Sequence, residues 1–109
     1  MKTGVERIAD ERVRQVVKEA YDASHDDDHD SGELAWAAVC YAAPGPVYSQ
    51  MEVPGGFRFQ DPWPWGIADD KRSEEDMPSA EDRIRLLEKA GALIAAEIDR
   101  LLRVEEKKK

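Results

Sequence analysis

The chain has 109 residues, of which 41% are hydrophobic and 37% charged, so we expect a single compact globular domain with a heavily charged surface. Its net charge of −8 argues against a nucleic-acid partner, because binding to a phosphate backbone draws on basic side chains. No apolar run reaches the roughly 20 residues of a membrane-spanning helix, and the first residues lack the apolar segment of a signal peptide. We therefore expect a cytoplasmic protein that does not enter a membrane.

The first predicted helix covers residues 4–21. Apolar residues recur in it at three- and four-residue spacing, and the opposite face is charged. The apolar positions are Val5, Ile8, Ala9, Val13, Val16, Val17, Ala20 and Tyr21. Such an amphipathic helix needs a partner to cover its apolar face.

The second predicted helix covers residues 31–43 and ends before Pro44, because a proline disfavours helical geometry in the residue that precedes it. Asp30, followed three positions later by Glu33, resembles a capping box. No residue from 34 to 43 is charged. We therefore expect this helix in the centre of the bundle, or partly in a subunit interface.

A 34-residue insert, residues 44–77, follows the second helix. Segments 47–53 and 57–60 flank Pro54-Gly55-Gly56, which predicts a small β-hairpin. The insert also contains a stretch rich in proline and tryptophan. Loops of this length in compact domains are usually functional or disordered.

The third predicted helix covers residues 79–104, and Ser79 before Asp82 is a typical start signal. Its apolar residues form a seam at three- and four-residue steps: Ile84, Leu87, Gly91, Ile94, Ile98 and Leu101. The predicted fold is thus mainly α, an antiparallel three-helix core with one long insert, in a single domain over residues 1–109. The small residues of the third helix and the uncharged face of the second exceed what a three-helix monomer hides, so we expect a homodimer through the second or the third helix.

Residues 25–33 contain the candidates for a metal site: His25, Asp26, Asp27, His29 and Glu33. Imidazoles four residues apart share a helical face, and with carboxylates they suit a divalent ion such as magnesium, manganese or zinc. Glu33 is also the candidate general base for a bound water. The alternative is that these carboxylates serve the positive N-terminal end of the second helix, with no metal and no catalysis.

A second candidate site lies in the insert. Pro62 and Pro64 hold Trp63 and Trp65 in an extended segment, which suggests a stacking platform for a base or another planar ring. Arg58 and Tyr41 complete this set of predicted ligand- or partner-binding residues. In the alternative interpretation, the two tryptophans only cover an exposed edge of the second and third helices.

Four motifs, in the order they occur, resemble a family of small phage and prophage proteins. They are Glu11-Arg12 with Arg14-Gln15, the HDD-x-H of residues 25–29 followed by Gly32-Glu33-Leu34-Ala35, Ala37-Ala38 and Tyr41-Ala42, then Trp63-Pro64-Trp65, and DR-x-R-x-L-x-KAGALI-x-AEI-x-RL from Asp82 onward. The same module resembles one appended to ead-type early-region phage proteins. The resemblance implies a phage-derived accessory protein in the host cytoplasm, acting for example against a host defence.

For function, these observations favour a non-enzymatic binding module for a host protein or a small nucleotide-like ligand. The alternative is a metal-dependent nucleotide hydrolase that uses the HDDDH segment and Glu33. A pyrophosphohydrolase of the MazG type would need two carboxylate pairs at helical spacing. Glu19 and Asp22 have that spacing, but Trp36 stands where the partner of Glu33 would be, so the set is incomplete.

Overall fold

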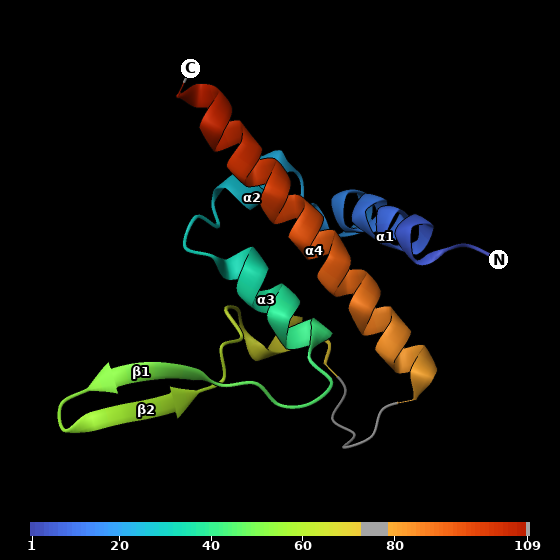
Figure 1. The fold of residues 1–109 in the computed structure, drawn as a ribbon. Coiled ribbons are helices and arrows are strands. Elements are labelled where there is room, and N and C mark those ends of the chain that lie inside the picture. Colours follow the sequence, from blue (N-terminus) through green and yellow to red (C-terminus); the bar gives the residue numbers. More distant parts are fainter. Residues whose placement is uncertain (73–78, 109) are drawn as a thin grey trace.

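The computed structural model describes residues 1–72 and 79–108, so the end of the predicted insert, residues 73–77, lies outside the described residues. The fold is mainly helical and includes one small antiparallel sheet (Figure 1). In chain order the elements are α1 (Gly4–Glu19), α2 (Ala23–Asp27), α3 (Glu33–Ala42), β1 (Ser49–Val53), β2 (Gly56–Gln60), the 3-10 helix η1 (Ile67–Asp69) and α4 (Ala80–Lys107). Within the described ranges, none of the helices combines the length and the apolar character needed to span a membrane.

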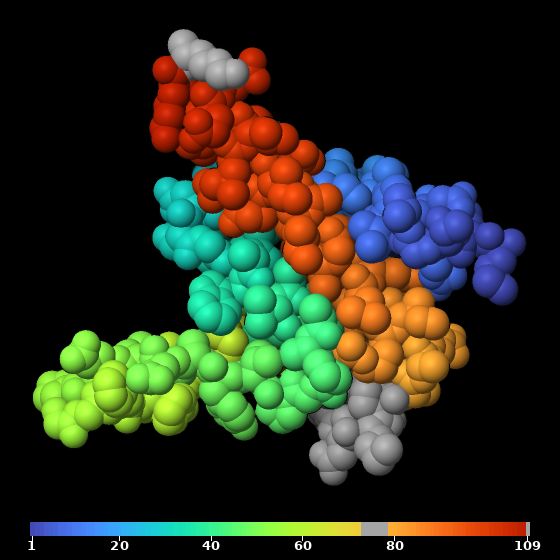
Figure 2. Space-filling model, in the orientation of Figure 1, coloured from blue at the N-terminus to red at the C-terminus, as the bar shows by residue number. Residues whose placement is uncertain are grey.

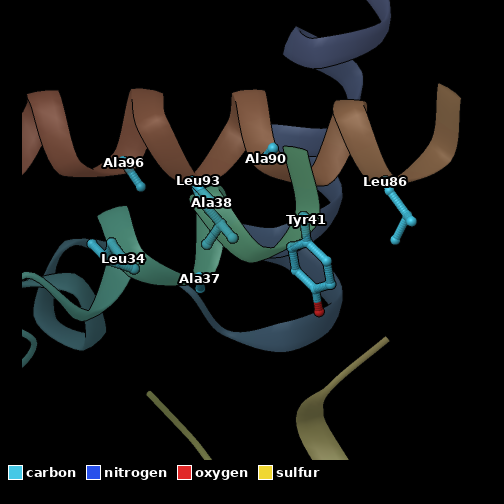
Figure 3. Packing of buried hydrophobic residues seen from close by; sticks show 8 residues of the cluster. All are labelled: Leu34, Ala37, Ala38, Tyr41, Leu86, Ala90, Leu93 and Ala96. Atoms are coloured by element: carbon cyan, nitrogen blue, oxygen red, sulfur yellow. The ribbon is translucent and has the colours of Figure 1, made fainter. Parts of the chain in front are cut away.

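The long helix α4 organises the molecule, with α3 running antiparallel along one side and α1 crossing it on another (Figure 1). The buried hydrophobic cluster lies between α3 and α4 (Figure 3). It comprises Leu34, Ala37, Ala38 and Tyr41 from α3, and Leu86, Ala90, Leu93 and Ala96 from α4. Four alanines keep the two backbones close. The uncharged helix buries one side against α4, whereas Trp36 and Val39 on its other side are 44% and 45% exposed, so α4 and not α3 takes the central position.

The two ends of α3 are held by different means. Gly32, in the left-handed region with φ 83°, precedes the first turn, and no side chain caps it. The predicted capping box at Asp30 is therefore wrong, because the chain turns at Gly32 and puts Asp30 two residues too early. At the other end, the Arg83 guanidinium of α4 donates to the carbonyl oxygens of Ala42 and Ala43 at 3.0 and 3.1 Å, where the helix dipole is negative.

The first helix, α1, is shorter than predicted, and it packs on α4 through its polar side instead of its apolar side. It ends at Glu19, because Ala20 adopts the left-handed region (φ 57°) and turns the chain into α2. The side of α1 that packs on α4 carries Glu11 and Gln15, each 3% exposed. Most of the predicted apolar face points to solvent, and Val5, Val13 and Val17 are 62–79% exposed.

Ion pairs hold α1 on α4. Glu11 accepts from Arg14 on its own helix at 2.6 Å and from Arg85 on α4 at 2.8 Å. Arg7 donates to Glu88 of α4 at 2.7 Å. Burial by itself would raise the pKa of Glu11, but the guanidinium groups of Arg14 and Arg85 outweigh it and lower this pKa to about 2.

The predicted seam of α4 is mostly uncovered. Its start at Ser79 is confirmed, since the Asp82 amide donates to the serine hydroxyl at 3.1 Å. One seam position is occupied: a Cβ on Gly91 would lie 2.6 Å from Ile8 Cδ1, so any larger residue here would displace the Ile8 side chain where α1 crosses. The other five positions, which we call the α4 stripe, are each 44–52% exposed: Ile84, Leu87, Ile94, Ile98 and Leu101. Figure 2 shows α4 running uncovered between α1 and α3 across the face in view.

The predicted hairpin is confirmed. Strands β1 and β2 pair antiparallel from Ser49↔Gln60 to Val53↔Gly56, around the two-residue turn Pro54-Gly55. Gly55 has φ 90°, a value that favours glycine. The hairpin projects from the helical body (Figures 1 and 2), and Phe57 and Phe59 on it are both 64% exposed.

Candidate functional site

Helix α2 and the turn after it bring the two histidines together. Asp22 caps α2 by accepting from the His25 amide at 3.0 Å. Asp26 is fully buried, and its Oδ2 accepts from Arg12 of α1 at 2.9 Å. Arg12 also donates to the Tyr21 carbonyl at 3.0 Å. One buried ion pair thus fixes α2 against α1.

The two imidazole rings face each other across a short gap. His25 Nδ1 lies 3.0 Å from Asp26 Oδ1, and His29 Nδ1 lies 3.1 Å from Glu33 Oε2. The two Nε2 atoms are 3.3 Å apart. Tyr21 stacks on the His25 ring at 4.3 Å between centroids, with an interplanar angle of 7°. Carboxylates on the outer nitrogens therefore fix both rings, and the parallel phenol of Tyr21 also holds the His25 ring.

The five predicted metal ligands do not converge on one point. Asp27 turns away and accepts from Arg103 of α4 at 2.8 Å, which lowers its pKa. Asp26 and Glu33 occupy the outer Nδ1 sides of the histidines, so only the Nε2 atoms remain facing each other. Within residues 1–72 and 79–108, no three or more His, Cys, Asp or Glu side chains are grouped to hold a metal ion. Glu33, the candidate base, accepts from the Ser31 amide and contacts His29.

Two adjoining cavities lie beside this pair, and they share Tyr21, Trp65 and Asp69 in their walls. The first has a volume of about 360 Å³ and is otherwise lined by His25, His29 and Gly66. The second has a volume of about 250 Å³ and reaches toward the helical core. Its remaining lining residues are Gln15, Glu19, Tyr41, Lys71, Lys89 and Leu93.

The second cavity combines aromatic walls with unsatisfied polar atoms. Gln15 Oε1 and Trp65 Nε1 are buried and have no hydrogen-bond partner in the described part of the chain. Buried polar atoms are nearly always paired in folded proteins, so an unpaired one indicates a position where a bound group could form a hydrogen bond. Burial also raises the pKa of Tyr41 to about 12 and lowers the pKa of Lys89.

The two predicted tryptophans have separate roles. Trp65 lines both cavities, whereas Trp63 lines neither. Their rings meet edge to face at 5.5 Å and 86°, so they cannot form one flat stacking platform. Trp63 donates through Nε1 to the Gly66 carbonyl at 3.1 Å and packs edge-on against Tyr41 at 5.2 Å. Both tryptophans pack against the α3–α4 core, as the alternative interpretation expected.

Tyr41 and Arg58, the other predicted binding residues, lie in different places. The Tyr41 ring belongs to the core, and its hydroxyl points away from α4 toward the insert (Figure 3). This hydroxyl donates to the Asp69 carbonyl at 3.3 Å and accepts from the Lys71 amide at 3.2 Å, which fixes one wall of the second cavity. Arg58 is exposed on β2 and lines neither cavity.

Sequence reasoning missed several lining residues. Tyr21 could have been found, because it precedes His25 and His29 by four and eight positions. Gln15 entered only as part of a motif, because the first helix was expected to turn its apolar side to the core. Lys71 and Lys89 come from segments far apart in the chain, and no local pattern joins them. Comparison of the chain with models of protein families, with curated proteins and with solved structures finds no match.

Proposed function

We propose that this chain is a non-enzymatic binding module for a small, planar, polar molecule of the nucleobase or nucleotide class. The observation that carries the proposal is the amide oxygen of Gln15. It belongs to a residue only 3% exposed, it lines the second cavity, and it has no hydrogen-bond partner among the described residues. A ligand N–H group would satisfy it.

The lining chemistry supports this ligand class. Tyr21, Tyr41 and Trp65 offer aromatic surface for a planar ring. Trp65 Nε1, also without a described partner, is a donor for a ligand carbonyl. Lys71 and Lys89 line the same cavity and would attract a phosphate, while Glu19 and Asp69, also in its walls, would accept hydrogen bonds from ligand N–H groups. The two cavities together have the size of a small-molecule site.

The resemblance to phage proteins adds a biological setting to this proposal. A small binding module made during infection would act as an accessory protein by sequestering a host nucleotide or a nucleotide-like signal. In that setting, counter-defence needs no catalysis, only an affinity that competes with the host receptor for the same ligand.

Isothermal titration calorimetry tests the proposal with adenosine, guanosine, cytidine, uridine and their 5′-monophosphates as probes. We expect at least one probe to bind. The variant Gln15→Met keeps the shape of the side chain and removes the amide. It should weaken that binding by about 10-fold, the value of roughly one hydrogen bond. Its melting temperature should change little, because the variant removes the buried Oε1 without a described partner together with one long 3.5 Å contact from Nε2 to Glu11.

The matched control is Arg58→Ala, which changes an exposed residue of the hairpin and should bind the same probe with unchanged affinity. Two results would contradict the proposal. One is the absence of binding for all eight probes up to about 1 mM. The other is a probe that binds Gln15→Met as tightly as the unchanged protein.

A further inference from the structure

The histidine pair has fewer protons than its contacts require. A carboxylate accepts hydrogen bonds, so His25 Nδ1 must carry a proton to contact Asp26, and His29 Nδ1 must carry one to contact Glu33. A neutral imidazole has a single N–H. Both Nε2 atoms therefore present lone pairs, and these lone pairs face each other at 3.3 Å. Two lone pairs at that distance repel each other unless a positive species lies between them.

The distance indicates which positive species fits. A proton would make one N–H···N contact, and 3.3 Å is longer than an ordinary hydrogen bond of this kind. A zinc ion binds imidazole nitrogen at about 2.0–2.1 Å. An ion at that distance from both Nε2 atoms would see them about 107° apart, close to the tetrahedral angle.

The surroundings resemble those of histidines that bind metals. Such histidines donate their second N–H to a carboxylate or carbonyl, which fixes the ring and makes the free nitrogen more basic. Asp26 and Glu33 take these positions, and Arg12 in turn holds Asp26. The pair lines the 360 Å³ cavity, so further ligands can come from solvent or from a bound molecule.

We propose that Nε2 of His25 and Nε2 of His29 together bind one first-row divalent cation of the zinc class. Two protein ligands leave at least two coordination positions open toward the cavity, where an oxygen of water or of a phosphate completes the shell. Asp26 and Glu33 act as positioning residues for the two rings. This site does not depend on whether the neighbouring cavity binds a nucleotide.

Titration calorimetry with ZnCl2, and visible absorption with CoCl2, test the site on the full chain. We expect one ion per chain and loss of binding in His29→Ala. Glu33→Gln keeps both metal ligands and the length of the side chain, and it should weaken binding about 10- to 100-fold through the ring it orients. This second variant keeps the test decisive if His29→Ala fails to fold.

Asp27→Asn is the matched control, because it removes a charge from the same acidic segment at a residue that pairs with Arg103 instead. Its affinity for zinc should match that of the unchanged protein. A loss in Asp27→Asn as large as in His29→Ala would mean that the ion binds the acidic segment diffusely, which overturns the proposal. Failure to bind Zn²⁺ or Co²⁺ up to about 1 mM would also overturn it and leave a shared proton between the rings.

A different observation concerns the α4 stripe defined above. Its residues follow the alternating three- and four-residue steps of a coiled-coil seam, with Gly91 at the one position that Ile8 covers. The exposed surface of the chain is 7654 Å² at 12.3 kDa, against about 6,100 Å² for a compact monomer of that mass. The protruding hairpin, the exposed valines of α1 and the α4 stripe all contribute to this excess.

We infer that the α4 stripe of one chain packs against the same stripe of a second copy. A seam with this repeat needs a helix with the same repeat, and α4 itself supplies one. A standard interface buries about 800 Å² on each partner, which is within the roughly 1,500 Å² by which this chain exceeds a compact monomer. The symmetric pairing also closes, so it gives a dimer and not a fibre.

Sedimentation equilibrium measures the association directly. We expect a dimer for the unchanged chain at about 100 µM, and a monomer for Ile98→Glu, whose charge would be buried without a partner in the dimer. The control Phe59→Glu alters an apolar residue on the hairpin that is 64% exposed, against 52% for Ile98, and this variant should remain a dimer. A monomeric unchanged chain, or a dimer that Phe59→Glu dissociates and Ile98→Glu does not, would overturn the inference.

Discussion

Helices α1 and α3 pack on the same long helix by opposite means. Helix α3 buries uncharged side chains, with Leu34 and Ala37 fully covered, and forms the hydrophobic core with α4. Helix α1 buries Glu11 and Gln15 and turns its valines to solvent. One helix is placed by the removal of apolar surface from water, and the other by guanidinium–carboxylate pairs.

The difference explains how a small chain keeps polar groups beside a cavity. Gln15, Glu19 and Arg12 reach the site only because α1 presents its polar side inward. Had the valines packed on α4, the same residues would lie in solvent. The cost is an exposed apolar face on α1.

The largest expected effect is on the α3 side. Leu34→Ala removes a fully buried side chain from the centre of the α3–α4 cluster and should lower the free energy of unfolding by about 3 kcal/mol. Urea denaturation measures it. Val39→Ala, on the 45%-exposed side of the same helix, should cost less than about 1 kcal/mol. Equal losses in the two variants would mean that burial of apolar side chains does not hold α3 on α4.

On the α1 side, Glu11→Gln should lower the free energy of unfolding by about 2–3 kcal/mol, because Arg14 and Arg85 lose a buried counter-charge. The carboxyl group has a folded pKa of about 2, below its usual 4.5, so its contribution is full above pH 4.5 and is lost as the pH falls toward 2. The gap between variant and unchanged protein should therefore close in acid. Asp10→Asn, on the same helix but exposed, serves as the control, and a gap that does not depend on pH would contradict the assignment.

The end of α3 offers a smaller and sharper test. Arg83→Met removes the donor to the Ala42 and Ala43 carbonyls while it keeps the aliphatic stem, and it should cost about 1.5–2 kcal/mol by thermal melting. Arg83→Lys keeps the charge near the helix end but cannot form both contacts. Its stability should therefore lie between that of the unchanged protein and that of Arg83→Met. A lysine variant as unstable as methionine would mean that the charge contributes nothing at this helix end.

The smallest effects distinguish a real cap from an apparent one. Ser79→Ala should cost about 1 kcal/mol, because the Asp82 amide loses its acceptor. Asp30→Ala should change the free energy of unfolding by less than about 0.5 kcal/mol, since Asp30 does not cap α3. Denaturation of both variants under the same conditions measures the two losses in free energy of unfolding. A larger loss for Asp30→Ala than for Ser79→Ala would mean that Asp30 does cap α3.

Patterns local in the chain were sufficient for the three long helices, the hairpin and the start of α4. Periodicity also identified the apolar residues of α1, but it could not say which face meets α4, since ion pairs with Arg85 and Glu88 decide this and lie more than 70 positions away. The break at Ala20 was invisible, because alanine rarely adopts a positive φ. In the site, the HDDDH residues were found, but which atoms face each other depends on the separate turn that α2 makes.

The contact of Arg83 with the last carbonyls of α3 has a consequence for how this protein can change. It fastens the start of α4 to the end of α3, so the chain between them leaves and returns at one fixed point. Doubling the length of such an excursion adds only about 0.6 kcal/mol of closure entropy. The hairpin at residues 49–60 can therefore change in length and sequence, or be replaced by design. The helices that carry the histidine pair keep their positions when it does.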